Sequence, residues 1–474
     1  MIKYVLGWLL MFMGVFLAVP LITAAAFLEG AFFSFLVVML ASLGLGFLLV
    51  LKKPKSTEIY AREGFVIVSL SWIILSLVGA VPFLLTGSTS SFVDALFESA
   101  SGFTTTGASI FPTIEQLPKS ILIWRGFSHW VGGMGVLVFI MAFLPLGGGQ
   151  NMHIMRAESP GPSVSKLVPR VKNTAIILYI IYFVMTFIMF ISLLISGMSV
   201  FDAVNTAFAT AGTGGFGIKN DSLASATAAQ QIIVTVFMLL FSINFNSYYL
   251  VMKLRFKEAL NAEIRAFIII VVAATAIITL NISHMFDSVL DALRHAAFTV
   301  ASLISTTGFS SIDFNLWPYL AHTILILVML VGACAGSTGG GIKVSRVLIL
   351  IKGMLRELGA IIHPRQVKKI TIDQKPVERE VIRSVNAYIT TFILIFVASL
   401  AIISFDNFDL TTNFTATLAT INNIGPGLGA VGPTSSFAAF SPLSKLVLTF
   451  DMLAGRLELF PMLLLFSPST YRRS

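Results

Sequence analysis

Four short, weakly polar segments recur along the chain, each between two long apolar segments and each containing a glycine. The glycines are Gly107, Gly214, Gly308 and Gly425, which lie 107, 94 and 117 residues apart. In three of the four segments a threonine directly precedes the glycine. One Thr-Gly pair carries no information, because such pairs are common in loops. Four segments in matching context indicate four internal repeats built around one point.

The composition places these repeats in a membrane. Of the 474 residues, 56% are hydrophobic and only 11% are charged, a balance that excludes an ordinary soluble globular protein. Apolar stretches of about 20 residues, the length that crosses a bilayer, recur along the whole chain with short breaks. The first stretch, Val5 to Ala24, lacks a convincing cleavage site and is interpreted as a retained helix. The single cysteine, Cys334, excludes an intramolecular disulfide.

The apolar segments predict an accessory unit followed by the four repeats. Two helices, Val5 to Ala24 and Phe32 to Leu51, come first and have no glycine segment between them. Each repeat then has the order apolar helix, short amphipathic helix, glycine turn, apolar helix. We therefore expect an all-α polytopic membrane protein with ten crossings, in which two N-terminal helices plus four helix–pore-helix–helix repeats surround one pseudo-fourfold pore. The expected units are 1–53 for the accessory helices and 54–150, 151–258, 259–360 and 361–474 for repeats 1 to 4. The outer helices are expected at 65–85 with 120–146, 173–197 with 229–252, 266–282 with 319–355, and 384–404 with 442–467.

The short amphipathic helices are predicted to enter the membrane and return as loops. They are too short to span the bilayer, and such backbone survives in a membrane only when it is buried against protein. An aspartate lies 12 to 17 residues before each glycine, where it is expected to cap the helix N-terminus: Asp94, Asp202, Asp291 and Asp409. The helix C-termini, which carry partial negative charge, would then face the glycines and favour a cation there.

Glycine turns that meet inside a membrane fit a filter for cations. Backbone carbonyls can crowd a narrow axis only where side chains are absent or point away, and glycine meets that demand. The four segments are Thr104 to Ser109, Gly212 to Gly217, Ser305 to Ser310 and Asn422 to Gly427.

The basic residues predict which ends face the cytoplasm, because short cytoplasmic loops retain lysine and arginine. With both termini inside, 25 of the 31 basic residues fall on one side. They include Lys53, Lys55, Arg156, Lys166, Arg170, the segments Lys253 to Arg265 and Lys343 to Arg383, and Arg472 and Arg473. The outer vestibule is then expected to be relatively negative and to steer cations inward.

Four further motifs, taken with the glycine segments, resemble a known family. They are Trp124 to Gly135 (WRGFSHWVGGMG), Arg156 to Pro162 (RAESPGP), Gly336 to Lys343 (GSTGGGIK) and Gly455 to Glu458 (GRLE). The chain resembles the TrkH, TrkG and KtrB superfamily of potassium transporters over nearly its entire length. The two leading helices are more similar to the TrkH branch, because KtrB lacks them.

The resemblance implies potassium uptake across the bacterial cytoplasmic (inner) membrane, with both termini in the cytoplasm. It assigns potassium coordination to Thr105, Thr106, Gly107, Thr213, Gly214, Thr306, Thr307, Gly308, Asn423, Ile424 and Gly425. The fourth segment, with its asparagines and Pro426, breaks perfect symmetry, so selectivity is expected to be weaker than in a symmetric tetrameric channel. Potassium is the transported ligand, and no cofactor is expected.

The resemblance also implies partners. It implies a homodimer and a cytoplasmic nucleotide-binding regulatory ring of the TrkA type. The basic segments Lys253 to Arg265 and Lys352 to Arg383 are candidate contacts for that ring, although charge that only sets the topology explains them equally well.

Two elements predict a gate beneath the filter. The run Gly336 to Gly341 has four glycines in six residues and cannot hold a regular helix. The family has an obstructing loop at this place, and a helix kink for packing is the alternative. Arg456 lies inside an apolar helix, where an unpaired guanidinium costs at least about 2.5 kcal/mol. The family places this arginine just under the filter, and pairing with Glu458 or Asp451 is the alternative. The predicted gate residues are Gly336, Ser337, Thr338, Gly339, Gly340, Gly341, Arg456 and Lys343, which either caps the loop or lies at the cytoplasmic boundary.

Other signals are weaker. Arg125 and His129 lie four residues apart between tryptophans and are expected as structural anchors at the outer membrane interface. A sodium- or proton-coupled potassium symporter is the alternative function, for which buried carboxylate relays would be the signal. An enzyme is not expected, because no catalytic pair is recognisable. Gly212, Gly214 and Gly217 have the spacing of a dinucleotide-binding turn but no soluble strand–helix–strand unit around them, so neither a nucleotide site nor a nucleic-acid partner is expected.

Overall fold

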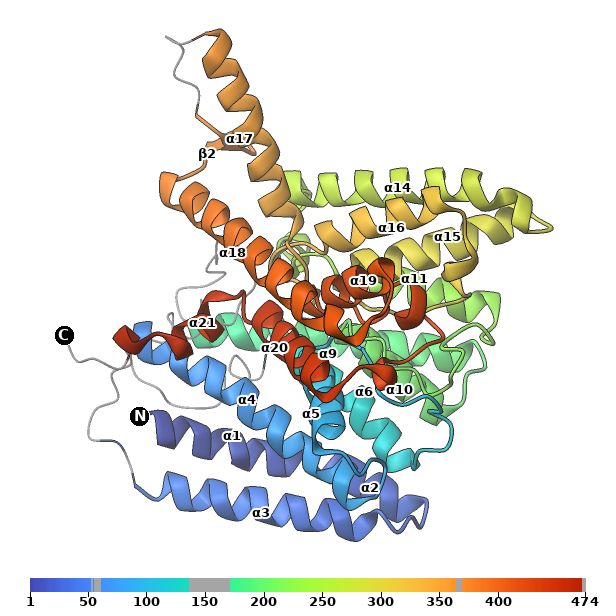
Figure 1. The fold of residues 1–474 in the computed structure, drawn as a ribbon, viewed down its shortest axis with the longest axis vertical. Coiled ribbons are helices and arrows are strands. Elements are labelled where there is room, and N and C mark those ends of the chain that lie inside the picture. Colours follow the sequence, from blue (N-terminus) through green and yellow to red (C-terminus); the bar gives the residue numbers. More distant parts are fainter. Residues whose placement is uncertain (53, 55–60, 136–170, 364–368, 471–474) are drawn as a thin grey trace.

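The computed structural model describes residues 1–52, 54, 61–135, 171–363 and 369–470, which fold almost entirely into helices (Figure 1). The predicted all-α class is therefore confirmed. Several residues of the predictions lie outside the described part of the chain: Lys53, Lys55, Arg156 to Pro162, Lys166, Arg170, Arg472, Arg473 and the end of the helix expected at 120–146.

Three helices form the accessory unit. They are α1 (Ile2–Phe16), α2 (Ala18–Ala26) and α3 (Phe32–Val50), so the first predicted helix is divided at Leu17. Helix α1 packs closely along α3 because a Cβ at Gly7, Gly14 or Gly46 would lie within 3.0 Å of the facing helix.

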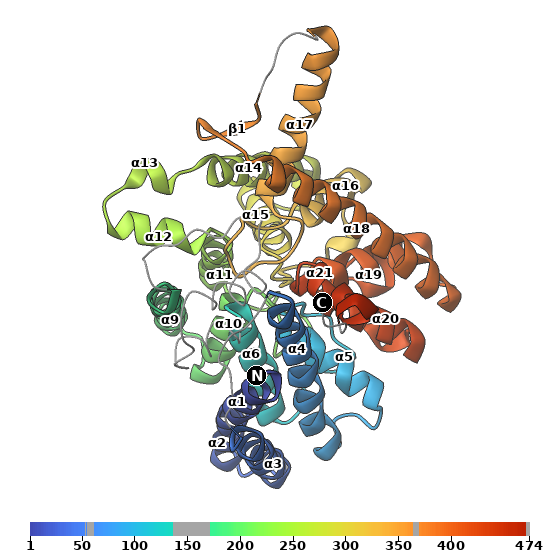
Figure 2. The ribbon, with the colours of Figure 1, turned by 90° about the vertical axis from the view of Figure 1, so that its left-hand side faces the viewer.

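The remaining helices form four groups of related order. Repeat 1 contains α4 (Ala61–Leu85), α5 (Phe92–Phe103) and α6 (Lys119–Gly133), and repeat 2 contains α9 (Val171–Ile195), α10 (Val200–Ala211), α11 (Ala228–Phe241) and α12 (Phe245–Met252). Repeat 3 contains α14 (Ala262–Ile282), α15 (Val289–Ile304), α16 (Tyr319–Val331) and α17 (Val344–Ile362), and repeat 4 contains α18 (Arg379–Ile403), α19 (Leu410–Ile421), α20 (Pro442–Arg456) and α21 (Phe460–Phe466). Figure 2 shows these groups around a common centre, with α1, α2 and α3 outside them and α17 projecting from the rest.

Two small elements connect the repeats. The short helix α13 (Phe256–Ala259) precedes α14, and the strands β1 (Thr371–Ile372) and β2 (Lys375–Pro376) form an antiparallel hairpin before α18. The hairpin is anchored to repeat 3, because Lys352 Nζ donates to Thr371 O at 2.7 Å and Arg265 pairs with Asp373 at 2.9 Å.

The last helix of a repeat is broken more often than the sequence predicts. Six helices of the described chain are long and apolar enough to cross a membrane, or seven if α11 and α12, bent by 91° at Ser242 to Asn244, count as one span. The expected break between α16 and α17 is present, but those between α11 and α12 and between α20 and α21 were not expected. Ten crossings stays a prediction, because these shorter pieces do not meet the length of a full span.

The pore helices α5, α10, α15 and α19 begin with caps that differ from the prediction. In the first three, a serine accepts the first-turn N–H, whereas Asp94, Asp202 and Asp291 lie in the first turn itself. Only Asp409 is an N-cap, and it accepts from Thr412 N at 2.9 Å. The aspartates of the first turn still complement the helix dipole, so the prediction was right about the charge and wrong about the capping group in three repeats.

Candidate ion filter and gate

All four pore helices end in the same backbone motif. The second residue after each helix has a left-handed conformation, with φ between 54° and 59° at Thr105, Thr213, Thr306 and Asn423. The N–H of the next residue then donates to the carbonyl five residues earlier, as in Thr106 N to Ser101 O at 2.9 Å. The equivalent bonds, all of 2.8 Å, join Gly214 to Ala209, Thr307 to Ser302 and Ile424 to Ala419. This is the Schellman cap, usually formed around glycine, and its fourfold repetition fixes how the repeats align.

The backbone aligns the second repeat one residue later than the sequence does. Two residues after each left-handed residue is a glycine with positive φ: Gly107 at 83°, Gly215 at 74°, Gly308 at 84° and Gly425 at 99°. Gly214 instead occupies the position of Thr106, Thr307 and Ile424. The prediction that Gly214 matches the other three glycines is therefore wrong by one residue.

The four segments close into a ring. A Cβ at Gly107 would collide with the carbonyl oxygen of Gly214 in the next repeat. The same collision joins Gly215 to Thr307 O, Gly308 to Ile424 O and Gly425 to Thr106 O, which returns to the start. Each glycine is thus required by the carbonyl of its neighbour, and only a residue without a side chain fits at these positive φ angles.

The ring leaves a set of carbonyl oxygens without donors, in residues that are buried except for the half-buried Gly107, Gly215 and Gly308. The N–H groups of Thr106, Gly214, Thr307 and Ile424 donate back to their own pore helices. Within the described chain, no donor reaches the carbonyl oxygens of the left-handed residues, of the residues after them or of the four glycines. Buried carbonyls are normally paired, and the C-termini of four helices add partial negative charge at the same place. The arrangement therefore suits a cation that has lost its water.

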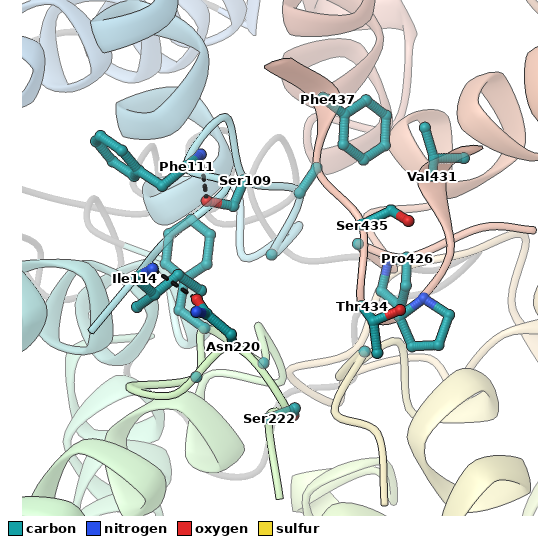
Figure 3. A pocket seen from close by; sticks show the side chains of 18 of the residues that line it. Ser109, Phe111, Ile114, Asn220, Ser222, Pro426, Val431, Thr434, Ser435 and Phe437 are labelled. Carbon is teal, nitrogen blue, oxygen red and sulfur yellow. Dashed lines mark hydrogen bonds between the residues drawn. The ribbon is translucent and has the colours of Figure 1, made fainter. Parts of the chain in front are cut away.

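A cavity lies on one side of this ring (Figure 3). It is lined by Gly107, Gly215, Gly308 and Gly425 and by residues that follow them in each repeat. The ionisable residues of its lining are Arg125 and Lys219. Arg125 is paired with Glu98, and the expectation of a relatively negative outer vestibule stays a prediction.

The segments that leave the ring are joined repeat to repeat. Between repeats 2 and 3, Leu223 N donates to Ser310 O at 3.0 Å, and between repeats 4 and 1, Phe437 N donates to Ser109 O at 2.8 Å. Asn315 joins repeats 3 and 4, because its side chain donates to Gly429 O at 3.3 Å and accepts from Gly429 N at 3.0 Å.

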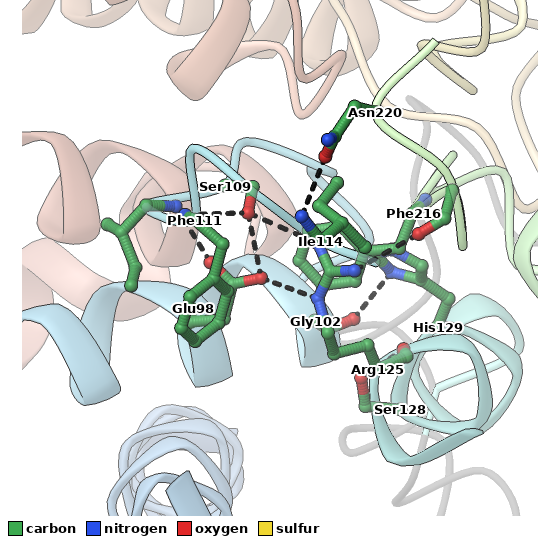
Figure 4. A network of polar contacts seen from close by, with 12 residues as sticks. Glu98, Gly102, Ser109, Phe111, Ile114, Arg125, Ser128, His129, Phe216 and Asn220 are labelled. Atoms are coloured by element: carbon green, nitrogen blue, oxygen red, sulfur yellow. Dashed lines mark hydrogen bonds and ion pairs between the residues drawn. The ribbon is translucent and has the colours of Figure 1, made fainter. Parts of the chain in front are cut away.

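Repeats 1 and 2 are joined by a charged network (Figure 4). Arg125 pairs with Glu98 at 2.7 Å and also donates to Gly217 O at 3.1 Å. His129 Nδ1 lies 2.8 Å from Gly102 O, and its Nε2 accepts from Phe216 N at 3.3 Å. Arg125 and His129 are 1% and 0% exposed, so the expected position at the membrane interface is wrong. They are buried behind the glycine segments, where they contact Gly217 O and Phe216 N of repeat 2.

The loop between α16 and α17 lies on the other side of the ring from the cavity. Gly340 N donates to Thr306 Oγ1 at 2.6 Å, and a Cβ at Gly340 would collide with Asn422 O. Ser337 and Thr338 are buried, and Thr338 Oγ1 donates to Phe241 O at 3.1 Å. The loop thus contacts the filter segments of repeats 3 and 4 and the broken end of α11.

Arg456 crosses beneath the ring toward repeat 1. Its guanidinium donates to Thr338 O at 2.9 Å, to Gly132 O at 2.5 Å and to Thr105 Oγ1 at 3.3 Å. The two acidic residues that the sequence offers as partners of Arg456 bind other groups. Glu458 pairs with Arg346, and Asp451 accepts a hydrogen bond from Ser399.

Lys343 belongs to the loop, not to the membrane boundary. Its side chain is 1% exposed, and its Nζ donates to Gly339 O. The reading in which Lys343 lies at the boundary is therefore wrong.

Glu263 is a functional candidate that the sequence did not reveal. Its Oε1 accepts from Ala335 N at 2.7 Å and from Ser345 N at 3.1 Å, so one carboxylate holds both ends of the loop. The residue is only 9% exposed. It lies 72 residues before Ala335, and a glutamate in the first turn of a helix gives no sign of such a contact.

The fold defines a class of protein: a multi-pass helical membrane protein, in which four glycine segments close into a ring. A family model described as TrkH, a cation transport protein, matches residues 30–472. The chain belongs to this family of cation transport proteins, which is not a family of enzymes.

Similar proteins match over almost their full lengths. The Trk system potassium uptake protein TrkH of Halomonas elongata is 35% identical over 480 residues, which cover 100% of this chain and 99% of that protein. The TrkH protein of Escherichia coli K12 is 34% identical over 99% of both chains. The crystal structure of the potassium transporter TrkH from Vibrio parahaemolyticus has a TM-score of 0.89 with 32% identity and covers 99% of both chains.

Proposed function

We propose that this chain takes up potassium across the bacterial cytoplasmic (inner) membrane through the ring of filter segments. The observation that carries the proposal is the closed ring of carbonyl oxygens without donors. A potassium ion that sheds its water needs such oxygens in place of its hydration shell. The relatives named as Trk system potassium uptake proteins favour potassium over other cations.

The proposed filter has the same backbone in all four repeats and different side chains in the fourth. Its residues are Thr105, Thr106, Gly107, Thr213, Gly214, Gly215, Thr306, Thr307, Gly308, Asn423, Ile424 and Gly425. In the fourth repeat, Asn423 Nδ2 donates to Thr106 Oγ1 at 3.0 Å and to Met452 O at 2.9 Å. This contact joins repeat 4 to repeat 1, so weaker selectivity would come from the one quarter of the ring that has different side chains.

The proposed gate consists of Gly336 to Gly341, Lys343 and Arg456. The loop closes against the ring through the Gly340 to Thr306 bond, and Arg456 places a positive charge beside Thr105. A potassium ion leaving the ring on this side would meet both the loop and the repulsion of the guanidinium. Opening requires that the loop leave the acceptors that now hold it, which include the Glu263 carboxylate.

The gate end of the molecule is proposed to face the cytoplasm. Glu263, at the start of α14, contacts the loop, and the basic segment from Lys253 to Arg265 leads directly into α14. Positive charge at this end fits a cytoplasmic side and both termini inside. The unit boundaries at 1–53, 54–150, 151–258, 259–360 and 361–474 are retained as part of this proposal.

Partners are proposed at the same end. Helix α17 projects from the ring of repeats (Figure 1). It carries exposed apolar side chains, among them Met354 at 56% and Leu355 at 58%, which supports a homodimer. The basic segments and the hairpin of β1 and β2 offer a surface to a nucleotide-binding ring of the TrkA type.

Rubidium uptake into proteoliposomes tests the function. Purified protein with an outward potassium gradient and no sodium or proton gradient should take up rubidium. A Gly308→Ser variant should lose this uptake or its selectivity, because a Cβ at Gly308 (φ 84°) would collide with Ile424 O. The matched control is Gly359→Ser on α17, where a Cβ meets nothing within 4 Å. Wild-type protein that takes up no rubidium under any gradient would contradict the proposal.

Proton coupling is a second candidate because of one buried carboxyl. Asp451 is 0% exposed, its Oδ1 accepts from Ser399 Oγ at 2.8 Å, and its Oδ2 has no partner among the described residues. A carboxyl in such a place is a common proton site in transporters. If uptake requires a proton gradient in the wild type and becomes independent of it in Asp451→Asn, the coupled reading replaces passive conduction. Uptake without any proton gradient would exclude it.

A further inference from the structure

A fully buried ion pair lies directly behind the filter segment of repeat 1, and neither of its residues belongs to the proposed filter or gate. Arg125 Nε is 2.7 Å from Glu98 Oε1, and the two side chains are 1% and 0% exposed (Figure 4). Lys445 and Asp94, which pair at the far end of the same pore helix, are more open, with Asp94 25% exposed. Burying two charges costs desolvation free energy, so we ask which further contacts this buried ion pair makes.

The pair fastens two neighbouring filter segments. The guanidinium donates to Ser109 Oγ at 3.1 Å in repeat 1 and to Gly217 O at 3.1 Å in repeat 2, and its carbon lies 4.1 Å from the centre of the Phe216 ring. Glu98 accepts from Ile110 N at 2.9 Å and from Ser109 Oγ at 3.1 Å. Ser109 and Gly217 each lie two residues beyond a ring glycine, so the contacts act immediately above the ring.

Beside the ring glycines, the other boundaries are joined through neutral groups, and the ion pair of Lys445 and Asp94 joins repeats 4 and 1 at the start of α5. Repeats 2 and 3 are joined by the bond from Leu223 N to Ser310 O, repeats 3 and 4 by Asn315, and repeats 4 and 1 by Phe437 N to Ser109 O. Nine residues before each ring glycine, where repeat 1 has Glu98, the other repeats have Thr206, Thr299 and Ala416. A charged brace is thus present at the boundary of repeats 1 and 2, where repeat 2 also has a glycine in place of the usual threonine.

We propose that Glu98 and Arg125 are positioning residues that fix the separation of the filter segments of repeats 1 and 2 and thereby contribute to cation selectivity. The inference rests on the proposed function. Gly214 has no side chain, so the segment of repeat 2 is the most deformable of the four in the ring. A rigid guanidinium fork that binds a carbonyl and a hydroxyl of adjacent segments holds the carbonyls of Thr106 and Gly214 at one spacing, which distinguishes ions of different radius.

The test compares rubidium and sodium uptake in an Arg125→Lys variant. Lysine keeps the charge and can reach Glu98, but it has no fork with which to bind Ser109 and Gly217 together. Rubidium uptake should persist, while the ratio of rubidium to sodium uptake falls roughly tenfold, which corresponds to about 1.4 kcal/mol of lost discrimination. The matched control is Lys445→Met, which breaks the other ion pair of α5 and should leave the ratio unchanged. An unchanged ratio in Arg125→Lys would overturn the proposal.

A second variant keeps the test decisive if Arg125→Lys does not fold. Ser109→Ala retains the ion pair and removes one hydroxyl link of the brace, so the ratio should fall roughly threefold, as expected for one lost neutral hydrogen bond. If the wild type takes up rubidium and Ser109→Ala keeps the wild-type ratio of rubidium to sodium uptake, the proposed role of Glu98 and Arg125 is wrong and the proposed function stands. Failure of the wild type to take up rubidium would instead remove the proposed function on which the brace rests.

Discussion

Replacing Glu263 by glutamine should release the loop without removing any atom that packs against it. The carboxylate accepts two N–H groups, from Ala335 at 2.7 Å and Ser345 at 3.1 Å, at the two ends of the loop. A hydrogen bond to a charged group contributes about 1.5–3 kcal/mol and one between neutral groups about 0.5–1.5 kcal/mol. Glutamine keeps the acceptor oxygen and loses the charge, so each bond should weaken by about 1 kcal/mol.

Weakening both bonds lowers the stability of the closed loop relative to an open loop by about 2 kcal/mol. The ratio of closed to open loop then falls about 30-fold. If the loop is the gate and is mostly closed, rubidium uptake into proteoliposomes by Glu263→Gln should rise by up to that factor. The shift is large because Glu263 is only 9% exposed and little screened by solvent.

The control for this experiment is Glu258→Gln, in the same segment. Glu258 pairs with Arg255 at the surface, where both side chains are more than half exposed, so its loss should leave uptake unchanged. Unchanged or lower uptake in Glu263→Gln, with a normal elution profile and thermal midpoint, would refute the assignment of the loop as a gate held by this carboxylate.

Three further predictions concern the ring and its supports. Gly215→Ala should abolish rubidium uptake, because its Cβ would strike the carbonyl of the next repeat at a φ of 74°, whereas Gly217→Ala, whose Cβ would lie no closer than 3.2 Å to any neighbour, should retain it. Thr306→Val should raise basal uptake, because it leaves a loop N–H without its acceptor, and Thr213→Val, whose hydroxyl bonds only to its own segment, should not. The hydroxyl of Thr412 and then its backbone N–H donate to Asp409 and lower the pKa of that carboxyl in the folded protein. The carboxylate therefore stabilises the fold above the unfolded-state pKa of about 3.9. This stabilisation is lost as the pH falls through the lower folded-state pKa. The thermal midpoint of the wild type should therefore drop more than that of Asp409→Asn between about pH 5 and pH 2, and equal drops would contradict this.

The register of the filter could have been predicted from the sequence with a different pattern. Aligning the Thr-Gly pairs places Gly214 with the other glycines, because that pattern requires the threonine to be adjacent to the glycine. The structure shows that the repeated unit is a left-handed residue, any residue, then glycine, as in Thr213, Gly214 and Gly215. In the sequence this unit is threonine, any residue, then glycine. The pattern is present in all four segments, with Asn423 in place of threonine in the last.

Other features depend on contacts that a single sequence does not display. Arg125 and His129 have apolar neighbours whether they lie at an interface or behind a filter, and the difference comes from Glu98, 27 residues earlier, and from repeat 2. The bend between α11 and α12 falls in a segment without glycine or proline, Ser242 to Asn244, so composition gives no sign of it. The break between α16 and α17 was predictable because four glycines in six residues exclude a helix whatever surrounds them.

The most direct test of the filter is to locate the ion in it. Crystals grown with rubidium or thallium should show an anomalous scattering peak enclosed by the carbonyl oxygens of Thr106, Gly214, Thr307 and Ile424, and exchange into sodium should remove it. Absence of a peak at this ring, in crystals that diffract well enough to show the ion elsewhere, would contradict the claim that these carbonyls replace the water of a permeating potassium ion.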